Sequence, residues 1–242
     1  MSGYQMTFER TEMKYLLDPV QYLQLKERLM GKMETDQYGN STICNVYFDT
    51  PDARLIRKSL EKPVYKEKFR LRSYGLPGQT SSVFLELKKK YQGIVYKRRE
   101  TLNLADAEAY LYRGIKPERQ TQVLREIDWF LHYYENMIPA MYISYERTAL
   151  YGLEDENLRL TLDGNILWRT DCLRLENGPW GTPLLEDGWF LMEIKIPGSM
   201  PLWLGHILDE LKIYPASFSK YGQAYEKQQI MRSEKKGGIS CA

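Results

Sequence analysis

Cysteine and histidine are scarce in this chain of 242 residues. The cysteines, Cys44, Cys172 and Cys241, are odd in number and far apart, which excludes a disulfide scaffold and a CxxC zinc site. No stretch approaches 18 consecutive apolar residues, and Met1 is followed by polar residues, so neither membrane spanning nor secretion is supported. We therefore expect a cytoplasmic protein with reduced thiols and no direct membrane insertion.

The sequence also lacks an excess of charge of one sign. It has 34 Lys and Arg against 32 Asp and Glu, a formal net charge of +2. Bulk charge therefore does not favour nucleic acid, and no aromatic and basic motif typical of RNA binding is present, so we expect no nucleic-acid partner. The motifs GxxxxGK(S/T), HExxH and GxSxG are absent as well. Any chemistry must therefore come from a local arrangement of other residues.

Extended runs alternate with short helices along the chain. Helices are predicted from Pro19, from Thr50-Pro51 to before Pro63, and over 104–113, 119–135, 202–211 and 218–231. Strands are predicted over 7–16, 43–49, 64–74, 83–90, 94–102, 141–150, 158–163, 166–175 and 189–196. Hairpin turns at 92–93 and 163–165 indicate antiparallel pairing, which forms either a sandwich or a closed sheet. We expect one domain over 1–232 and a flexible tail over 233–242.

Charged residues alternate with apolar ones along six of these runs. Lys66, Lys68, Arg70 and Arg72 occupy every second position of one run, so in a strand they share a face. The same alternation places other residues on one face of their runs: Arg10, Glu12 and Lys14; Glu86, Lys88 and Lys90; Tyr145 and Arg147; Arg159, Thr161 and Asp163; Glu193 and Lys195. The basic residue of the run 94–102 that shares this orientation is predicted to be Arg98 from its spacing to Gly93, or Lys97 or Arg99 if the strand bulges.

A solvated outer face explains any single strand of this kind. The set is mainly basic, however, and a like-charged pair 4 Å apart costs on the order of 4 kcal/mol at a dielectric constant near 20. The pattern therefore predicts a charge-dense anionic partner such as a polyphosphate chain or a nucleoside triphosphate. Glu12, Glu86 and Glu193 are interpreted as oxygen ligands of Mg²⁺ or Mn²⁺, or as groups that orient the basic side chains.

Eight segments resemble, in order, the polyphosphate-polymerase domain of the vacuolar transporter chaperone (VTC) family, within the triphosphate tunnel metalloenzymes (CYTH-like). They are FERTEMKYLL (8–17), NVYFDTPD (45–52), KFRLRSYG (68–75), ELKKKYQGIVYKRR (86–99), YERTAL (145–150), RLTLD (159–163), MEIKIP (192–197) and SFSKYGQAY (217–225). Each motif is weak alone, and eight in order are specific.

The resemblance implies an α+β fold, an antiparallel eight-stranded β-barrel with helices packed outside. It also implies a divalent metal, Mn²⁺ or Mg²⁺, and transfer of the ATP γ-phosphate to a growing polyphosphate chain. By resemblance, the phosphate-binding positions are Lys14, Arg70, Arg72, Lys88, Arg147 and Arg159, the metal ligand is Glu193, and Tyr145, Ser219 and Lys220 are further tunnel contacts.

We expect a catalytic group and a substrate-binding group among these residues. The catalytic residues are predicted to be Arg70, Arg72, Arg147, Arg159 and Lys88, and the substrate-binding ones Lys14, Arg10, Lys68, Arg98, Tyr145, Lys195, Ser219 and Lys220. Arg10 stands where the wider superfamily has the first glutamate of a Glu-x-Glu-x-Lys signature, which favours a polymerase over a simple triphosphatase.

Two alternatives stay open at this point. The first is a tripolyphosphatase or nucleoside triphosphatase that uses water as the acceptor, and the second is a non-catalytic polyphosphate-binding module. ATP and polyphosphate or triphosphate are the expected ligands, and a membrane-protein partner that receives the product is compatible with the scheme.

Overall fold

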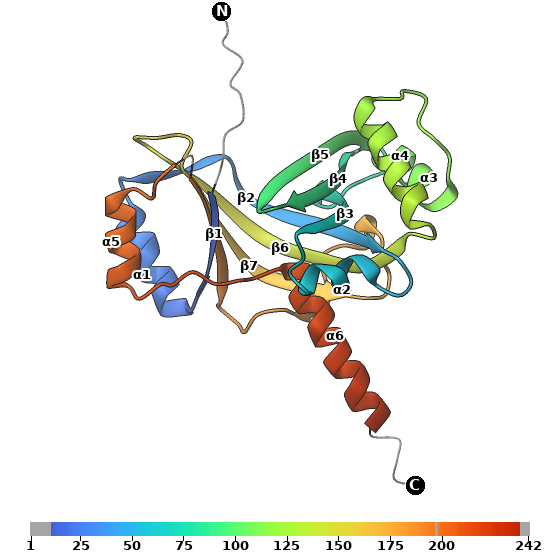
Figure 1. Ribbon diagram of the computed structural model, residues 1–242. Helices are drawn as coiled ribbons and strands as arrows, with labels where there is room; N and C mark the ends of the chain where they lie inside the picture. The colour runs from blue at the N-terminus through green and yellow to red at the C-terminus, as the bar shows by residue number, and fades with distance from the viewer. Residues whose placement is uncertain (1–10, 197, 238–242) are drawn as a thin grey trace, which may run out of the picture. The chain divides into compact units, whose positions relative to one another are not determined.

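A computed structural model describes residues 11–196 and 198–237 of the chain (Figure 1). The helices in these ranges are α1 (Pro19–Leu29), α2 (Arg54–Leu60), α3 (Leu104–Arg113), α4 (Gln122–Tyr134), α5 (Leu202–Glu210) and α6 (Lys220–Gly237). The strands are β1 (Thr11–Leu17), β2 (Met33–Asp49), β3 (Tyr65–Tyr74), β4 (Ser82–Tyr91), β5 (Ile94–Asn103), β6 (Ile138–Gly152), β7 (Arg159–Arg169), β8 (Thr182–Pro183) and β9 (Phe190–Ile196).

Capping side chains fix where several helices begin. Asp18 and Gln21 form a reciprocal capping box at the start of α1, and Pro19 occupies its first turn. Asn103 caps α3 and Thr121 caps α4 in the same way, by accepting a hydrogen bond from a backbone N–H of the first turn. These helices begin within three residues of the predicted positions.

The eight longer strands pair in the order β1-β9-β7-β6-β2-β3-β4-β5, and β8 pairs with β7. The strand registers are antiparallel throughout β1–β9, β7–β9, β2–β3, β3–β4 and β4–β5. The prediction of an α+β protein with eight main antiparallel strands is confirmed. Within the described residues this order has two ends, β1 and β5, in place of a closed ring of pairings.

The chain forms two compact units, which are described separately. The first comprises the described residues of 1–41, 145–166 and 185–218, and the second comprises those of 42–144, 167–184 and 219–242. The long strands β2, β6 and β7 each contribute one part of their length to each unit.

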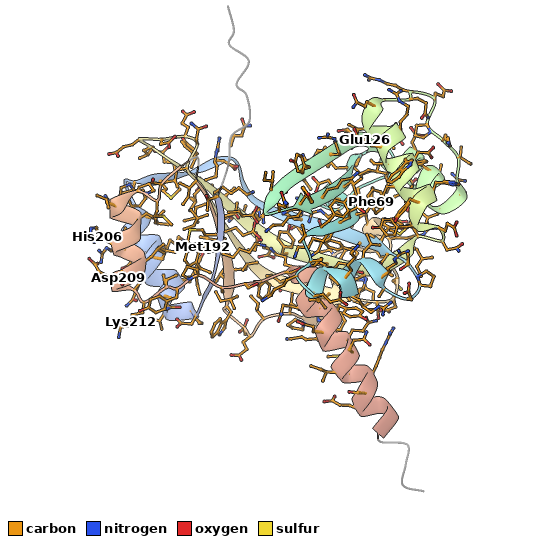
Figure 2. The ribbon with its side chains drawn as sticks, viewed as in Figure 1. Phe69, Glu126, Met192, His206, Asp209 and Lys212 are labelled. Atoms are coloured by element: carbon orange, nitrogen blue, oxygen red, sulfur yellow. The ribbon has the colours of Figure 1, made fainter. Side chains whose placement is uncertain are left out.

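Each unit buries the apolar face of its strands under helices. In the first unit, Leu160, Met192 and Ile194 pack with residues of α1 and α5, and Figure 2 labels Met192 on its strand. In the second unit, Phe69 and Leu85 of the sheet pack with residues of α3 and α4. Because side chains alternate along a strand, the charged residues of the same strands project from the opposite face.

The predicted hairpin at 163–165 is wrong, because β7 runs unbroken from Arg159 to Arg169. Gly164 serves a different purpose: a Cβ there would lie 2.5 Å from Cε1 of Phe190, so glycine lets this ring approach the strand. The predicted turn at Gln92 and Gly93 is confirmed. Both residues have positive φ, 47° and 88°, as the tight turn between β4 and β5 requires.

β2 and α6 extend well beyond their predicted ranges. β2 begins at Met33, ten residues before the predicted strand 43–49, because its early part is polar and lacks an apolar alternation. α6 continues to Gly237, so residues 233–237 of the predicted tail are helical, while 238–242 lie outside the described residues. Among the described helices, none combines the length and the apolar character needed to cross a bilayer.

Candidate functional site

A row of polar side chains crosses the charged face of the second unit. Tyr47 of β2 lies opposite Arg70 of β3, Arg70 lies opposite Glu86 of β4, and Glu86 lies opposite Arg99 of β5. Residues in direct register project to the same side of a sheet. The sheet register therefore brings four residues from four strands into one line.

Glu86 is the centre of a group that we call the Glu86 cluster: Glu86, Arg70, Arg72, Lys97 and Arg99. Arg70 donates to Glu86 Oε2 from Nε at 2.8 Å and from Nη2 at 2.6 Å. Lys97 Nζ lies 2.6 Å from Glu86 Oε1, and Arg99 Nε lies 2.8 Å from the same oxygen. Arg72 Nε is more distant, 3.8 Å from Glu86 Oε2. One carboxylate thus holds four basic side chains.

The charges of the Glu86 cluster do not balance. Glu86 is 2% exposed, and burial alone would raise its pKa. The positive charges of Arg70, Arg72 and Lys97 outweigh burial and hold the pKa of Glu86 well below its usual range, so it is ionised at neutral pH. Among these five side chains, one carboxylate contacts four basic groups. An anion that joins this cluster is therefore favoured electrostatically.

Two residues that the site prediction omitted support the arginines of the Glu86 cluster. Arg72 Nε donates to Asn45 Oδ1 at 2.8 Å, and Asn45 Nδ2 donates to the Ile143 carbonyl at 2.9 Å. Arg70 Nη1 donates to the Tyr47 hydroxyl at 2.9 Å. Burial alone would raise the pKa of the Tyr47 hydroxyl, but the positive charges of Arg70 and Arg72 outweigh burial and lower this pKa. The alternation of Asn45 and Tyr47 with buried Val46 and Phe48 was the signal that could have found them.

Three of the predicted lysines lie on the same face of the second unit or near it. Lys68 lies opposite Lys88, and Lys88 lies opposite Lys97. Lys68 Nζ donates to Ser219 Oγ at 2.8 Å, and this oxygen also accepts from the Gly222 N–H at 3.1 Å. Lys220 begins α6, and its charge contributes to the lowered pKa of Tyr47. The structure therefore brings Lys68, Ser219 and Lys220 to the start of α6.

The prediction that Arg98 shares the face of Glu86 is wrong. Arg98 lies opposite Leu87, a core residue, and its Nε donates at 2.8 Å to Glu126 of α4, which Figure 2 labels. The two-residue turn pairs Tyr91 with Ile94, and this register places Lys97 and Arg99 on the side of Glu86. The sequence prediction counted alternate residues from Gly93 without knowing this register, and it therefore assigned Arg98 to the wrong face of the strand.

The first unit carries a second group, the Glu193 cluster: Glu193, Lys14, Arg147 and Asp163. Lys14 lies opposite Glu193, with Nζ 3.2 Å from Oε1. Arg147 Nη2 lies 3.9 Å from Glu193 Oε2. Arg147 also donates to both oxygens of Asp163, from Nε and Nη2 at 2.6 Å each, so its guanidinium is held by a buried carboxylate. Asp163 was absent from the predicted site, although it is in phase with Arg159.

Other predicted residues surround the Glu193 cluster in the first unit. Glu12 lies 3.7 Å from Lys14 Nζ and opposite Lys195, and Lys195 lies opposite Arg159. The guanidinium of Arg147 lies 5.2 Å from the centre of the buried Tyr145 ring. Lys14 Nζ also donates to the Phe218 carbonyl at 3.1 Å. Arg10 lies outside the described residues.

The carboxylates do not form a metal centre by themselves. Within the part of the chain that the structure describes, no group of three or more His, Cys, Asp or Glu residues could hold a metal ion. Arg70 and Arg99 donate to the two oxygens of the buried Glu86, and Lys97 Nζ lies 2.6 Å from one of them, so a metal role for Glu86 does not fit its surroundings. Cations also approach both oxygens of Glu193, but at longer distances, 3.2 Å for Lys14 Nζ and 3.9 Å for Arg147 Nη2. Of the two carboxylates, Glu193 is therefore the better fit for an ion that takes one protein carboxylate and obtains its other ligands from substrate phosphates, as Mg²⁺ commonly does.

The fold is shared with two solved structures. A Bacillus halodurans protein described as a candidate adenylate cyclase matches with a TM-score of 0.54 and 16% identity, over 86% of this chain and 92% of that one. A Hippeastrum protein, described as a candidate adenylyl cyclase with a dominant triphosphatase activity, matches with a TM-score of 0.52 and 17% identity, over 87% and 92%. A comparison with curated proteins found no match.

These two structures share with this chain a fold of one antiparallel sheet combined with helices. The family model of the VTC domain matches residues 9–228. The chain therefore belongs to the VTC domain family.

Proposed function

We propose that this protein is a metal-dependent polyphosphate polymerase, which transfers the γ-phosphate of ATP to a growing polyphosphate chain. The observation that carries the proposal is the Glu86 cluster, in which four basic side chains from two strands share a single carboxylate. Such an excess of positive charge is stabilised by a ligand of high negative charge density. Membership of the VTC domain family supports a polyphosphate as that ligand.

The proposed reaction breaks one phosphoanhydride bond and forms another. A terminal oxygen of the polyphosphate chain attacks the γ-phosphorus, the bond from the γ-phosphorus to the bridging oxygen breaks, and ADP leaves with that oxygen. The attacking oxygen is already ionised, so no general base is required. Arg70 and Arg72 of the second unit, and Arg147 and Arg159 of the first, are each proposed to neutralise negative charge on the reacting phosphates, because phosphoryl transfer depends mainly on positioning and charge stabilisation.

The remaining basic residues are proposed to bind the rest of the phosphate chain. They are Lys14, Lys68, Lys88, Lys97, Arg99, Lys195 and Lys220, with Lys97 and Arg99 replacing Arg98 of the sequence prediction. Glu193 is proposed to bind Mg²⁺ or Mn²⁺, which supplies positive charge to phosphate oxygens when bound. The cytoplasmic location, the membrane-protein partner and the single-domain organisation stay predictions.

Hydrolysis is the second candidate function. The Hippeastrum protein of similar fold is described as having a dominant triphosphatase activity. In this alternative water replaces the polyphosphate end as the acceptor, and the same basic residues bind the triphosphate. Products distinguish the two reactions, because a polymerase forms longer condensed phosphate and a hydrolase releases orthophosphate.

A matched pair of variants on β5 tests whether the face of the Glu86 cluster binds phosphate. Arg99→Ala removes a cation from that face and is expected to weaken tripolyphosphate binding about tenfold, since a charge-assisted hydrogen bond contributes about 1.5–3 kcal/mol. Arg98→Ala removes the same charge from the α4 side and is expected to change the Kd less than twofold. Calorimetric titration measures both. Equal losses in the two variants would show that only net charge matters and would contradict the assigned site.

A further inference from the structure

Thr161 has a buried hydroxyl that no group of the described residues satisfies. It lies on β7 between Arg159 and Asp163, and it is 8% exposed. Its Oγ1 has no hydrogen-bond partner within residues 11–196 and 198–237. An unsatisfied buried hydroxyl costs about 1–3 kcal/mol, so such groups in proteins usually have a partner that protein atoms do not supply.

The strand register directs Thr161 to the Glu193 cluster. Thr161 lies opposite Glu193, and Glu193 lies opposite Lys14, so the three residues form a row across β7, β9 and β1. The neighbours Leu160 and Leu162 project to the other face and pack in the core of the first unit. The hydroxyl therefore lies on the charged face, beside the carboxylate and basic groups of the proposed site.

The chemistry of Thr161 complements that of its neighbours. Lys14 and Arg147 supply positive charge, but their interactions with Glu193 and Asp163 direct part of their hydrogen-bonding capacity to carboxylates. A threonine hydroxyl adds a neutral donor that no carboxylate occupies. Because Oγ1 itself is covered in the ligand-free protein, a phosphate oxygen can accept from it once the groups that cover it move aside on binding.

We propose that Thr161 is a substrate-binding residue that donates its hydroxyl hydrogen bond directly to a phosphate oxygen of the bound triphosphate or polyphosphate. This assignment deepens the proposed function and rests on it. It accounts for a polar residue at a buried strand position where valine, which has nearly the same shape, would leave no unsatisfied group. The stability of the free protein and the affinity for phosphate should therefore respond in opposite ways to loss of this hydroxyl.

Thr161→Val tests the assignment through both quantities. The variant without ligand is expected to keep the Tm of the wild type or exceed it, because the hydroxyl has no protein partner to lose. Its Kd for sodium tripolyphosphate is expected to rise about tenfold, whereas Thr161→Ser, which keeps the hydroxyl, should stay within about threefold of the wild type. Calorimetry with EDTA and with MgCl₂ should show the Thr161→Val loss in both conditions.

Several results would overturn the assignment. A clear fall in the Tm of ligand-free Thr161→Val would mean that the hydroxyl bonds within the protein. A loss of affinity only with MgCl₂ would mean that Thr161 acts through a metal-bound water and not on phosphate. Wild-type affinity in Thr161→Val would overturn this assignment alone, whereas failure of the wild type to bind tripolyphosphate would overturn the proposed function with it.

Discussion

Glu86→Gln is expected to lower the free energy of unfolding by about 3–5 kcal/mol, because it removes the charge of a buried carboxylate that contacts four basic side chains. The loss should be visible as a lower Tm and a lower urea midpoint at neutral pH. Tripolyphosphate should raise the Tm of this variant more than that of the wild type, since the added anion replaces the missing negative charge. A metal-ligand role for Glu86 predicts the reverse, a normal Tm with lost metal-dependent turnover.

The same variant has a distinctive pH dependence. The pKa of Glu86 is lower in the folded protein than the value of about 4.3 expected in the unfolded chain. A depressed pKa contributes stability that is present above pH 4.3 and is lost as the pH falls toward the folded-state value. The stability difference between wild type and Glu86→Gln should therefore be largest near pH 7 and should shrink as the pH falls below 4.

Glu126→Gln is the matched control for Glu86→Gln. Glu126 also pairs with an arginine, Arg98, but its side chain is 28% exposed against 2% for Glu86. Exposed pairs contribute about 0–1 kcal/mol, so its loss should have a small effect at every pH. A comparable loss of stability in both variants would contradict the central position of Glu86.

Glu193→Gln is expected to reduce metal-dependent turnover by about 100-fold or more, because it removes the charge of the carboxylate that we propose binds a metal ion shared with substrate phosphates. Tripolyphosphate binding without metal should be kept or become tighter, since a negative charge leaves the site. Initial rates with ATP over a range of Mn²⁺ concentrations, together with calorimetry in EDTA, measure the two effects.

Glu146→Gln is the control for Glu193→Gln. Glu146 is an exposed carboxylate on β6. It is next to Arg147 in the sequence, so its side chain projects to the opposite face of the strand. It should keep the turnover and the metal dependence of the wild type. Normal metal-dependent turnover in Glu193→Gln would remove the metal role from this residue, and an equal loss in Glu146→Gln would show a general charge effect.

Period-two alternation was sufficient to predict most strands and the composition of their charged faces. Lys66, Lys68, Arg70 and Arg72 all share a face, because the alternation of a strand depends only on local backbone geometry. Helix starts such as Asp18-Pro19 were equally visible, since capping is also local. The Gln92-Gly93 hairpin followed from the requirement of its turn for positive φ.

Features that depend on tertiary packing were not visible. Gly164 and Asn165 have the composition of a turn, but both lie within β7, where the Phe190 ring packs against Gly164 and Asn165 keeps a positive φ of 46°. Arg98 was placed on the wrong face because the parity of β5 follows from its pairing with β4 and not from its own residues. The metal role predicted for Glu86 does not fit its surroundings, because a sequence does not show that four cations converge on one carboxylate.

The most direct test of the account is incubation of the purified protein with ATP and Mn²⁺, followed by ³¹P NMR. Condensed and free phosphate give separate signals in this measurement. We predict growth of the chain-internal phosphate signal together with ADP, and strong reduction of both in Glu193→Gln. Orthophosphate alone would contradict the polymerase and favour hydrolysis. If neither condensed phosphate nor orthophosphate forms, catalysis by this protein is contradicted.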